Sequence, residues 1–380
     1  MGIFRFITYK QFLLLAILLR IASTPTANAS YLLIAAYALR GRAQAIQALA
    51  LSWLFTMISP GIAAEATFGS IGRYAVLGAV VLSVLLRSRR TIERLLIKRV
   101  TLATLLLGLF FIVHSYFFSP IFDVSVLKAL SWTLAMATLK AAWSGLDDAQ
   151  RVVLEKQFFG GLILVMLVSL PLLGFELGYL RNGRGFQGIL NHPQAFGPTI
   201  ALLGAWATSQ IFGQKKPTWS MLALVIACFV LVVLSQTRTA GLALIIGVGL
   251  SIVIAPILSG HSIRVVLPGL RSKRVCLMLV ICLGGMIILG PKLAGRISDY
   301  VVKGGQTTNI VEAYEVSRGM LILRMLSNIK EEPWQGVGFG IASNSSEMLV
   351  SRDPLLGLPV GAPIEKGTMP LAVLEEVGVI

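Results

Sequence analysis

The sequence predicts an all-α, polytopic integral membrane protein, and three observations lead to this fold class. Of its 380 residues, 56% are hydrophobic and 13% are charged, and the mean hydropathy is +0.82. A soluble chain of this length cannot bury so much apolar surface, whereas apolar runs of about 20 residues suit membrane spans. The basic residues behind the net charge of +16 gather between those runs, as the positive-inside rule describes. We therefore expect a lipid bilayer, and no nucleic acid, as partner.

Apolar runs that approach the length of a span occur at eleven places in the chain. The first two are the weakest, because Ser23–Thr26 interrupts them and the second is short. Residues 1–291 are thus expected to form a transmembrane helical bundle of about eleven spans. The runs lie near residues 3–22, 27–40, 43–62, 72–87, 100–119, 124–145, 157–179, 194–213, 219–235, 239–259 and 275–291.

Basic residues mark four connecting loops as cytoplasmic, namely 87–99, 140–156, 215–216 and 264–274. Because the spans alternate between these loops, 181–193, 236–238 and everything after 292 are expected on the other side. The segment 292–380 has short amphipathic runs, Gly-rich turns and balanced charge, which indicates a folded extracytoplasmic loop domain. A new apolar run begins close to Ile380, so we expect one or more further C-terminal spans.

The first candidate site is the stretch that leads from Arg181 and Arg184 to Asn191, His192 and Pro193. Asn191 is a good helix N-cap, and Pro193 suits the first turn of the following span. A helix N-terminus attracts anions, and arginine offers forked donors that match phosphate oxygens. The alternative is that the arginines extend to lipid headgroups while His192 merely caps the helix.

The second candidate site, Ser235–Arg238, interrupts an apolar stretch at the same expected face, again where a span begins. The Ser, Gln and Thr side chains are expected to cap the helix, while Arg238 directs its charge into a cavity. The alternative is a simple membrane anchor. Two arginines at helix starts on one face together predict a pocket for a diphosphate that is approached from the outer leaflet.

The third candidate site lies in the loop domain, where Arg318 falls within an amphipathic run over 314–329 and comes before a glycine-rich segment at 336–340. No strand comes before these glycines, so tight backbone turns are favoured over a nucleotide-binding loop. The acidic and basic groups Glu365–Lys366 and Glu375–Glu376 are interpreted as solvated charges of the outer face, with a catalytic role for one of them as the alternative.

Ionisable groups inside the predicted spans give little sign of an ion path. Glu65, Asp123 and Glu176 fall near span ends, and His114 is interpreted as a neutral core histidine with its hydrogen bonds satisfied. The pattern therefore weakens a proton-coupled transporter. Three cysteines lie inside apolar runs without metal-ligand spacing, and no metal or other cofactor is expected.

Three motifs in order resemble the O-antigen ligase and O-antigen polymerase-like family of bacterial membrane proteins: Arg184 to Gly197, Leu234 to Ala240, and Ser317 to Gly319 followed by Glu332 to Gly340. The resemblance implies a GT-C-like, multi-pass protein of the bacterial inner membrane whose active face is periplasmic. It also implies metal-independent transfer of a glycan from undecaprenyl diphosphate to lipid A-core or to a growing polysaccharide.

The family's diphosphate-binding arginines correspond to Arg181, Arg184, Arg238 and Arg318, with His192 in the same binding site. The chain departs from the family before the leucine-rich run 371–378, where Gly367 stands at the position of the usual histidine. Glu365 is therefore the candidate general base. An anion transporter, since some relatives have been labelled bicarbonate transporters, and an inactive truncated paralogue remain alternatives.

Overall fold

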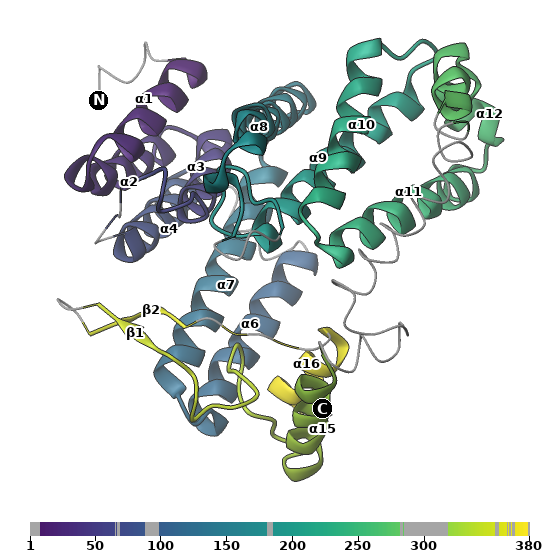
Figure 1. The fold of residues 1–380 in the computed structure, drawn as a ribbon. Helices are drawn as coiled ribbons and strands as arrows, with labels where there is room; N and C mark the ends of the chain where they lie inside the picture. The colour runs from purple at the N-terminus through teal and green to yellow at the C-terminus, as the bar shows by residue number, and fades with distance from the viewer. Residues whose placement is uncertain are drawn as a thin grey trace. The chain divides into compact units, whose positions relative to one another are not determined.

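The computed structural model describes residues 8–64, 66, 69–87, 99–180, 185–281, 284, 318–353, 357–362, 364, 366 and 369–378. The protein is 76% helical, and the all-α class is confirmed (Figure 1). It divides into two compact units: Met1–Thr56 with Ile62–Leu154 and Tyr314–Ile380, and Met57–Gly61 with Glu155–Ala313. The predicted domains, 1–291 and 292–380, are defined by the side of the membrane on which they lie. The two units are defined by contacts within the chain, so the predicted division stays a prediction.

The first unit contains the N-terminal helices and the described part of the predicted loop domain. Its helices are α1 (Tyr9–Ala22), α2 (Thr24–Ala38), α3 (Arg42–Thr56), α4 (Gly69–Leu86), α6 (Arg99–Phe118), α7 (Phe122–Ser144), α15 (Met320–Glu331) and α16 (Met369–Val377). Strands β1 (Ser351–Arg352) and β2 (Pro359–Gly361) form an antiparallel hairpin. An ion pair of 2.6 Å between Arg352 and Asp123 joins this hairpin to the start of α7.

The second unit is built around three apolar helices. Helix α8 (Asp148–Ser169) leads into it and is followed by the short 3-10 helices η2 (Leu170–Gly174) and η3 (Glu176–Gly178). Helices α9 (Pro193–Gly213), α10 (Trp219–Leu234) and α11 (Arg238–Ser259) then pack on one another. The short elements α12 (Ile263–Val266) and η4 (Pro268–Arg271) follow, and Leu267 joins a buried apolar cluster with Ala207 and Leu222.

Four helical segments among the described residues are long and apolar enough to cross a membrane: Arg99–Phe118, Phe122–Ser144, Asp148–Gly174 and Arg238–Ser259. Two shorter apolar helices, Ile71–Leu86 and Trp219–Leu234, add to them. These segments are expected of an α-helical membrane protein that associates with a lipid bilayer. The count of eleven spans stays a prediction, and the run at 275–291 lies largely outside the described residues.

The bounds of several helices follow the predicted runs closely, because apolar runs and breaking residues are local features. The interruption predicted at Ser23 is the break between α1 and α2, where Ser23 has φ −165° and its side chain caps α2. Helix α8 begins at Asp148 rather than near 157, so the charged segment before the apolar run is helical. The predicted basic loop at 140–156 is therefore wrong: the described connection between α7 and α8 is Gly145–Asp147.

Two arginines close helix ends in the first unit. Arg42 donates to the carbonyl of Gly145, the C-cap of α7, at 3.0 Å, and to the carbonyl of Arg87 at 3.2 Å. Arg87 donates in turn to the carbonyl of Leu39, the C-cap of α2, at 2.5 Å. The last carbonyls of a helix lack partners within the helix and attract cations. Part of the basic charge therefore stabilises helix C-termini.

Candidate functional site

Helix α9 starts at the first predicted site, with one correction to the predicted cap. His192, not Asn191, is the N-cap: its Nδ1 accepts the Gln194 N–H at 3.1 Å. The Asn191 N–H instead donates to the Met57 carbonyl at 2.7 Å, which holds the chain just before the helix. Pro193 occupies the first turn as predicted. The His192 side chain is exposed and acts as the alternative interpretation describes, as a helix cap.

The second predicted site is a tight turn between α10 and α11. Gln236 has φ 56°, a left-handed conformation that residues other than glycine rarely adopt. Thr237 precedes α11, but its side chain bonds the Ser235 hydroxyl at 2.6 Å and makes no hydrogen bond to the helix N-terminus. The prediction that these side chains cap α11 is therefore wrong. They hold the turn, and Arg238 is the first residue of the helix, half-buried.

The structure brings these two predicted sites together. The Phe186 N–H donates to the Leu234 carbonyl at 2.9 Å. Helix α9 approaches the start of α11 so closely that a Cβ on Gly197 would lie 1.7 Å from Thr237 Oγ1. The N-terminal parts of α9 and α11 therefore lie side by side, with α10 connecting the two helices along the chain. Arg181 and Arg184 lie outside the described residues, immediately before Gly185, which packs against Pro193 and the Ser235 carbonyl.

This arrangement suits an anion. At the start of α9, Pro193 has no N–H, and the Gln194, Ala195 and Phe196 N–H groups bond to His192. What favours an anion is therefore the positive ends of two helix dipoles that lie next to each other. Arg238 adds a guanidinium at one of them. Among the residues described, no group of three His, Cys, Asp or Glu side chains is placed to hold a metal ion.

Substituting Gly197 tests this close approach. Gly197→Ala is expected to lower the free energy of unfolding by about 1–3 kcal/mol, because the new methyl overlaps the Thr237 side chain. Thr237→Ala in the same background should restore part of the loss. Gly213→Ala, at the open end of α9 with nothing near its added Cβ, is the control. Equal free energies of unfolding for the Gly197→Ala and Gly213→Ala variants, measured in detergent, would contradict the close packing of α9 against the start of α11.

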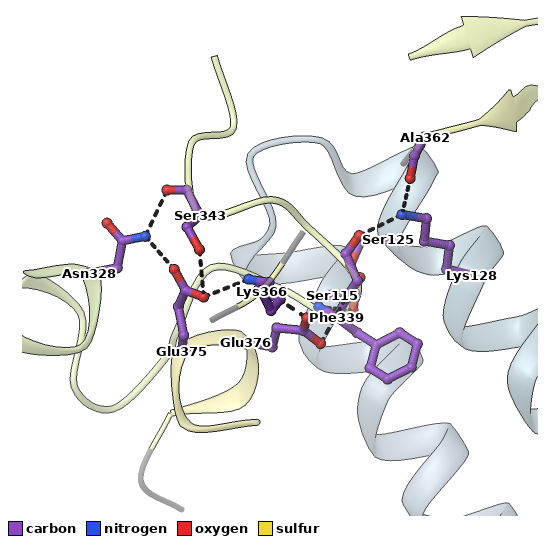
Figure 2. Close-up of polar contacts among 11 residues, drawn as sticks. Ser115, Ser125, Lys128, Asn328, Phe339, Ser343, Ala362, Lys366, Glu375 and Glu376 are labelled. Carbon is purple, nitrogen blue, oxygen red and sulfur yellow. Dashed lines mark hydrogen bonds and ion pairs between the residues drawn. The ribbon is translucent and has the colours of Figure 1, made fainter. Parts of the chain in front are cut away.

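A second polar site lies in the first unit, where the loop segments contact α6 and α7. We define the loop cluster as Lys128, Lys366, Glu375 and Glu376 (Figure 2). Glu375 Oε2 lies 2.6 Å from Lys366 Nζ, and Glu376 Oε1 lies 3.7 Å from it. Lys128 Nζ donates to the carbonyls of Gly340 and Ala362 at 2.7 and 2.8 Å.

The loop cluster corrects the interpretation of these groups as solvated. The Glu375 side chain is 0% exposed and that of Lys366 is 9% exposed. Glu375 also accepts from Asn328 Nδ2 at 2.6 Å and from the Ser343 hydroxyl at 3.0 Å. Its carboxylate therefore has three donors, as a buried charge requires.

The glycine-rich segment makes the tight turns that the sequence predicts. Gly336, Gly338 and Gly340 have φ of 59°, 94° and 69°, which glycine adopts without steric cost. These turns direct Phe339 onto α6, where its ring stacks on Phe111 with centroids 4.8 Å apart. The Gly340 N–H, next along the chain, donates to Glu376 Oε2 at 2.9 Å, so the turns also bring the segment to the loop cluster.

Arg318 is the predicted site residue that the structure connects to the loop cluster. Its Nη1 donates to the backbone carbonyl of Lys366 at 3.0 Å. Glu365, the candidate base, and Gly367 lie outside the described residues, on either side of Lys366. The amphipathic run predicted over 314–329 corresponds to α15, which the structure describes from Met320 to Glu331.

The structure also describes two ionisable candidates from the predicted spans, His114 and Glu176. His114 is buried between the rings of Phe110 and Phe118, which confirms it as a core residue. Its ring interacts with the backbone of Gln335, and the expectation that its hydrogen bonds are satisfied stays a prediction. Glu176 is exposed in η3, and Glu65 lies outside the described residues.

Lys128 is the polar residue that sequence reasoning missed. The predicted span 124–145 contains Lys128 as well as Lys140 near its cytoplasmic end. A lysine inside a span is a signal of functional or structural importance, because a charge within a membrane needs a partner. In the structure those partners are two loop carbonyls.

The Glu376 carboxyl provides a pH test of the loop cluster. Burial raises its pKa, and the charge of Glu375 adds to the effect; the Gly340 N–H and the charges of Lys366 and Lys128 oppose it. The folded protein then holds the proton of the Glu376 carboxyl more tightly than the unfolded chain does. This proton therefore stabilises the folded state fully below the unfolded pKa of about 4.3, and the stabilisation is lost as the pH rises through the folded pKa. Glu376→Gln should therefore gain stability relative to the native protein as the pH rises above the unfolded pKa. Identical pH dependence of both unfolding free energies would contradict this.

Comparisons of the chain with protein-family models, with curated proteins and with solved structures find no match. The resemblance of its three motifs to the O-antigen ligase and polymerase-like family therefore stays a sequence-based prediction.

Proposed function

We propose that the protein is a glycosyltransferase of the bacterial inner membrane. It moves a glycan from undecaprenyl diphosphate to lipid A-core or to a growing polysaccharide, on the periplasmic face and without a metal ion. The proposal includes a GT-C-like bundle of about eleven spans. The observation that carries it is the adjacency of the α9 and α11 N-termini with Arg238 at the second of them.

The chemistry of a lipid-diphosphate donor matches this arrangement. The acceptor hydroxyl attacks the anomeric carbon, the bond from that carbon to the diphosphate oxygen breaks, and the hydroxyl proton passes to a base. Negative charge develops on the departing diphosphate, so fixed positive charge and oriented N–H groups lower the barrier. Arg238 and the two helix dipoles supply the positive charge. The family resemblance, and not the structure, adds Arg181, Arg184 and Arg318 as further diphosphate ligands and Glu365 as the base.

The experiment uses the purified full-length protein in liposomes with an undecaprenyl-diphosphate-linked oligosaccharide, candidate acceptors and a chelator of divalent metals. Transfer that requires Arg238 but not divalent metal would support the proposal, and the acceptor used would separate ligase from polymerase. Absence of transfer, combined with Arg238-dependent anion uptake into the same vesicles, would replace it with an anion transporter.

A further inference from the structure

Lys366 has two roles in the first unit, one for its side chain and one for its backbone. Its ammonium is held 2.6 Å from Glu375 Oε2 and 3.7 Å from Glu376 Oε1. Its carbonyl accepts the Arg318 guanidinium at 3.0 Å. Because the side chain is anchored, the carbonyl has a defined position, and the guanidinium bound to it is positioned as well.

The anchor extends to helix α7, one of the segments long enough to cross a membrane. Glu376 Oε2 accepts the Gly340 N–H at 2.9 Å, and the Gly340 carbonyl accepts from Lys128 on α7 at 2.7 Å. Lys128 also binds the carbonyl of Ala362 at 2.8 Å, four residues before Lys366. The same lysine therefore holds both the glycine-rich segment and the chain that leads to Lys366 (Figure 2).

The charge balance of the loop cluster favours a geometric role. It contains two lysines and two glutamates, so its formal charges cancel when all four are ionised. Buried ion pairs contribute little net stability, because the loss of hydration offsets their attraction. Such a group does restrict its members to one arrangement, since each alternative leaves a buried charge unpaired.

We propose that the loop cluster is a positioning device for Arg318: through Lys366 it sets where the Arg318 guanidinium lies relative to helix α7, and thereby sets the affinity for the diphosphate of a lipid donor. The ligand part of this inference rests on the proposed function. Lys366, Glu375, Glu376 and Lys128 are positioning residues, because they act through Arg318.

A double-mutant cycle tests whether Lys366 acts through Arg318. The dissociation constant of undecaprenyl diphosphate is measured for Lys366→Met, Arg318→Ala and the double variant. Each single change is expected to weaken binding about tenfold, the effect of losing one charged hydrogen bond. The double variant should bind no more weakly than Arg318→Ala alone. Lys366→Arg, which keeps the positive charge, should restore most of the affinity.

The matched control is Lys330→Met, which removes an exposed lysine from α15 in the same unit; it should bind as the native protein does. If Lys366→Met fails to fold, Glu375→Gln replaces it, since the amide keeps the size of the side chain and removes the charge opposite Lys366. Additive losses in the double variant would overturn the positioning role.

Hydrogen exchange gives a second readout that needs no lipid. Peptides that cover 318–323 and 336–340 should exchange faster in Lys366→Met than in the native protein, while peptides from α9 should not change. Unchanged exchange in both loop peptides overturns the positioning device, whatever the binding data show. Faster exchange in a protein whose native form does not bind undecaprenyl diphosphate would instead overturn the proposed function and leave the positioning of Arg318 standing.

Discussion

Arg238→Ala is expected to lower the rate of glycan transfer by about 10²- to 10³-fold, the usual cost of removing one donor to a developing negative charge. The effect should appear in the turnover rate at saturating donor, because in the proposed reaction the diphosphate gains charge as the glycosidic bond breaks. Arg238 begins α11 beside the N-terminal part of α9, so its charge acts together with two helix dipoles. The measurement is single-turnover transfer in liposomes.

Two further variants make the Arg238 result specific. Arg238→Lys keeps the charge but loses the planar fork, so it should retain more activity than the alanine variant and less than the native protein. Arg264→Ala removes an exposed arginine from α12, beyond the far end of α11, and should transfer normally. If Arg238→Ala inserted into the membrane normally, kept the native melting temperature and transferred glycan at the native rate, the central claim of the proposed function would be wrong.

Glu375→Ala is expected to lower the free energy of unfolding by about 3–5 kcal/mol. The change leaves the buried ammonium of Lys366 without its closest carboxylate and removes the acceptor for Asn328 and Ser343. The free energy is measured by titration with sodium dodecyl sulfate in mixed micelles.

The control for Glu375 is Glu347→Ala. The Glu347 side chain is 74% exposed and lies 4.0 Å from Arg324, a surface pair worth at most about 1 kcal/mol. The combined variant Lys366→Met with Glu375→Leu should recover much of the loss, because no unpaired charge remains buried. A loss for Glu375→Ala no larger than that for Glu347→Ala would show that the carboxylate is solvated, as the sequence had indicated.

Local patterns in the sequence predicted the helical elements well. The apolar runs at 100–119, 219–235 and 239–259 correspond to α6, α10 and α11 with bounds that differ by one residue at most. The turns at Gly336–Gly340 also follow from the residue type, since positive φ favours glycine. These features depend on neighbours in the chain, so sequence alone is sufficient for them.

The candidate sites were predicted less completely. The two arginine-bearing segments were expected on one face, and the structure brings the chain around Pro193 and Ser235 together within the second unit. It corrected the caps: the His192 side chain caps α9, while the Asn191 N–H bonds the Met57 carbonyl, which is remote in sequence. Which hydroxyl binds which partner is decided by such contacts and not by residue type.

The sequence by itself determined the helical class, the apolar segments suited to a membrane and the glycine turns, because backbone preference and hydropathy are properties of short stretches. Only the tertiary structure decided that Glu375 and Lys366 are buried and that Lys128 binds the carbonyl of Gly340, 212 residues away. The same charged residue is solvated on an open surface and becomes a buried anchor when another segment covers it. Burial and pairing depend on that distant segment, and no local pattern records it.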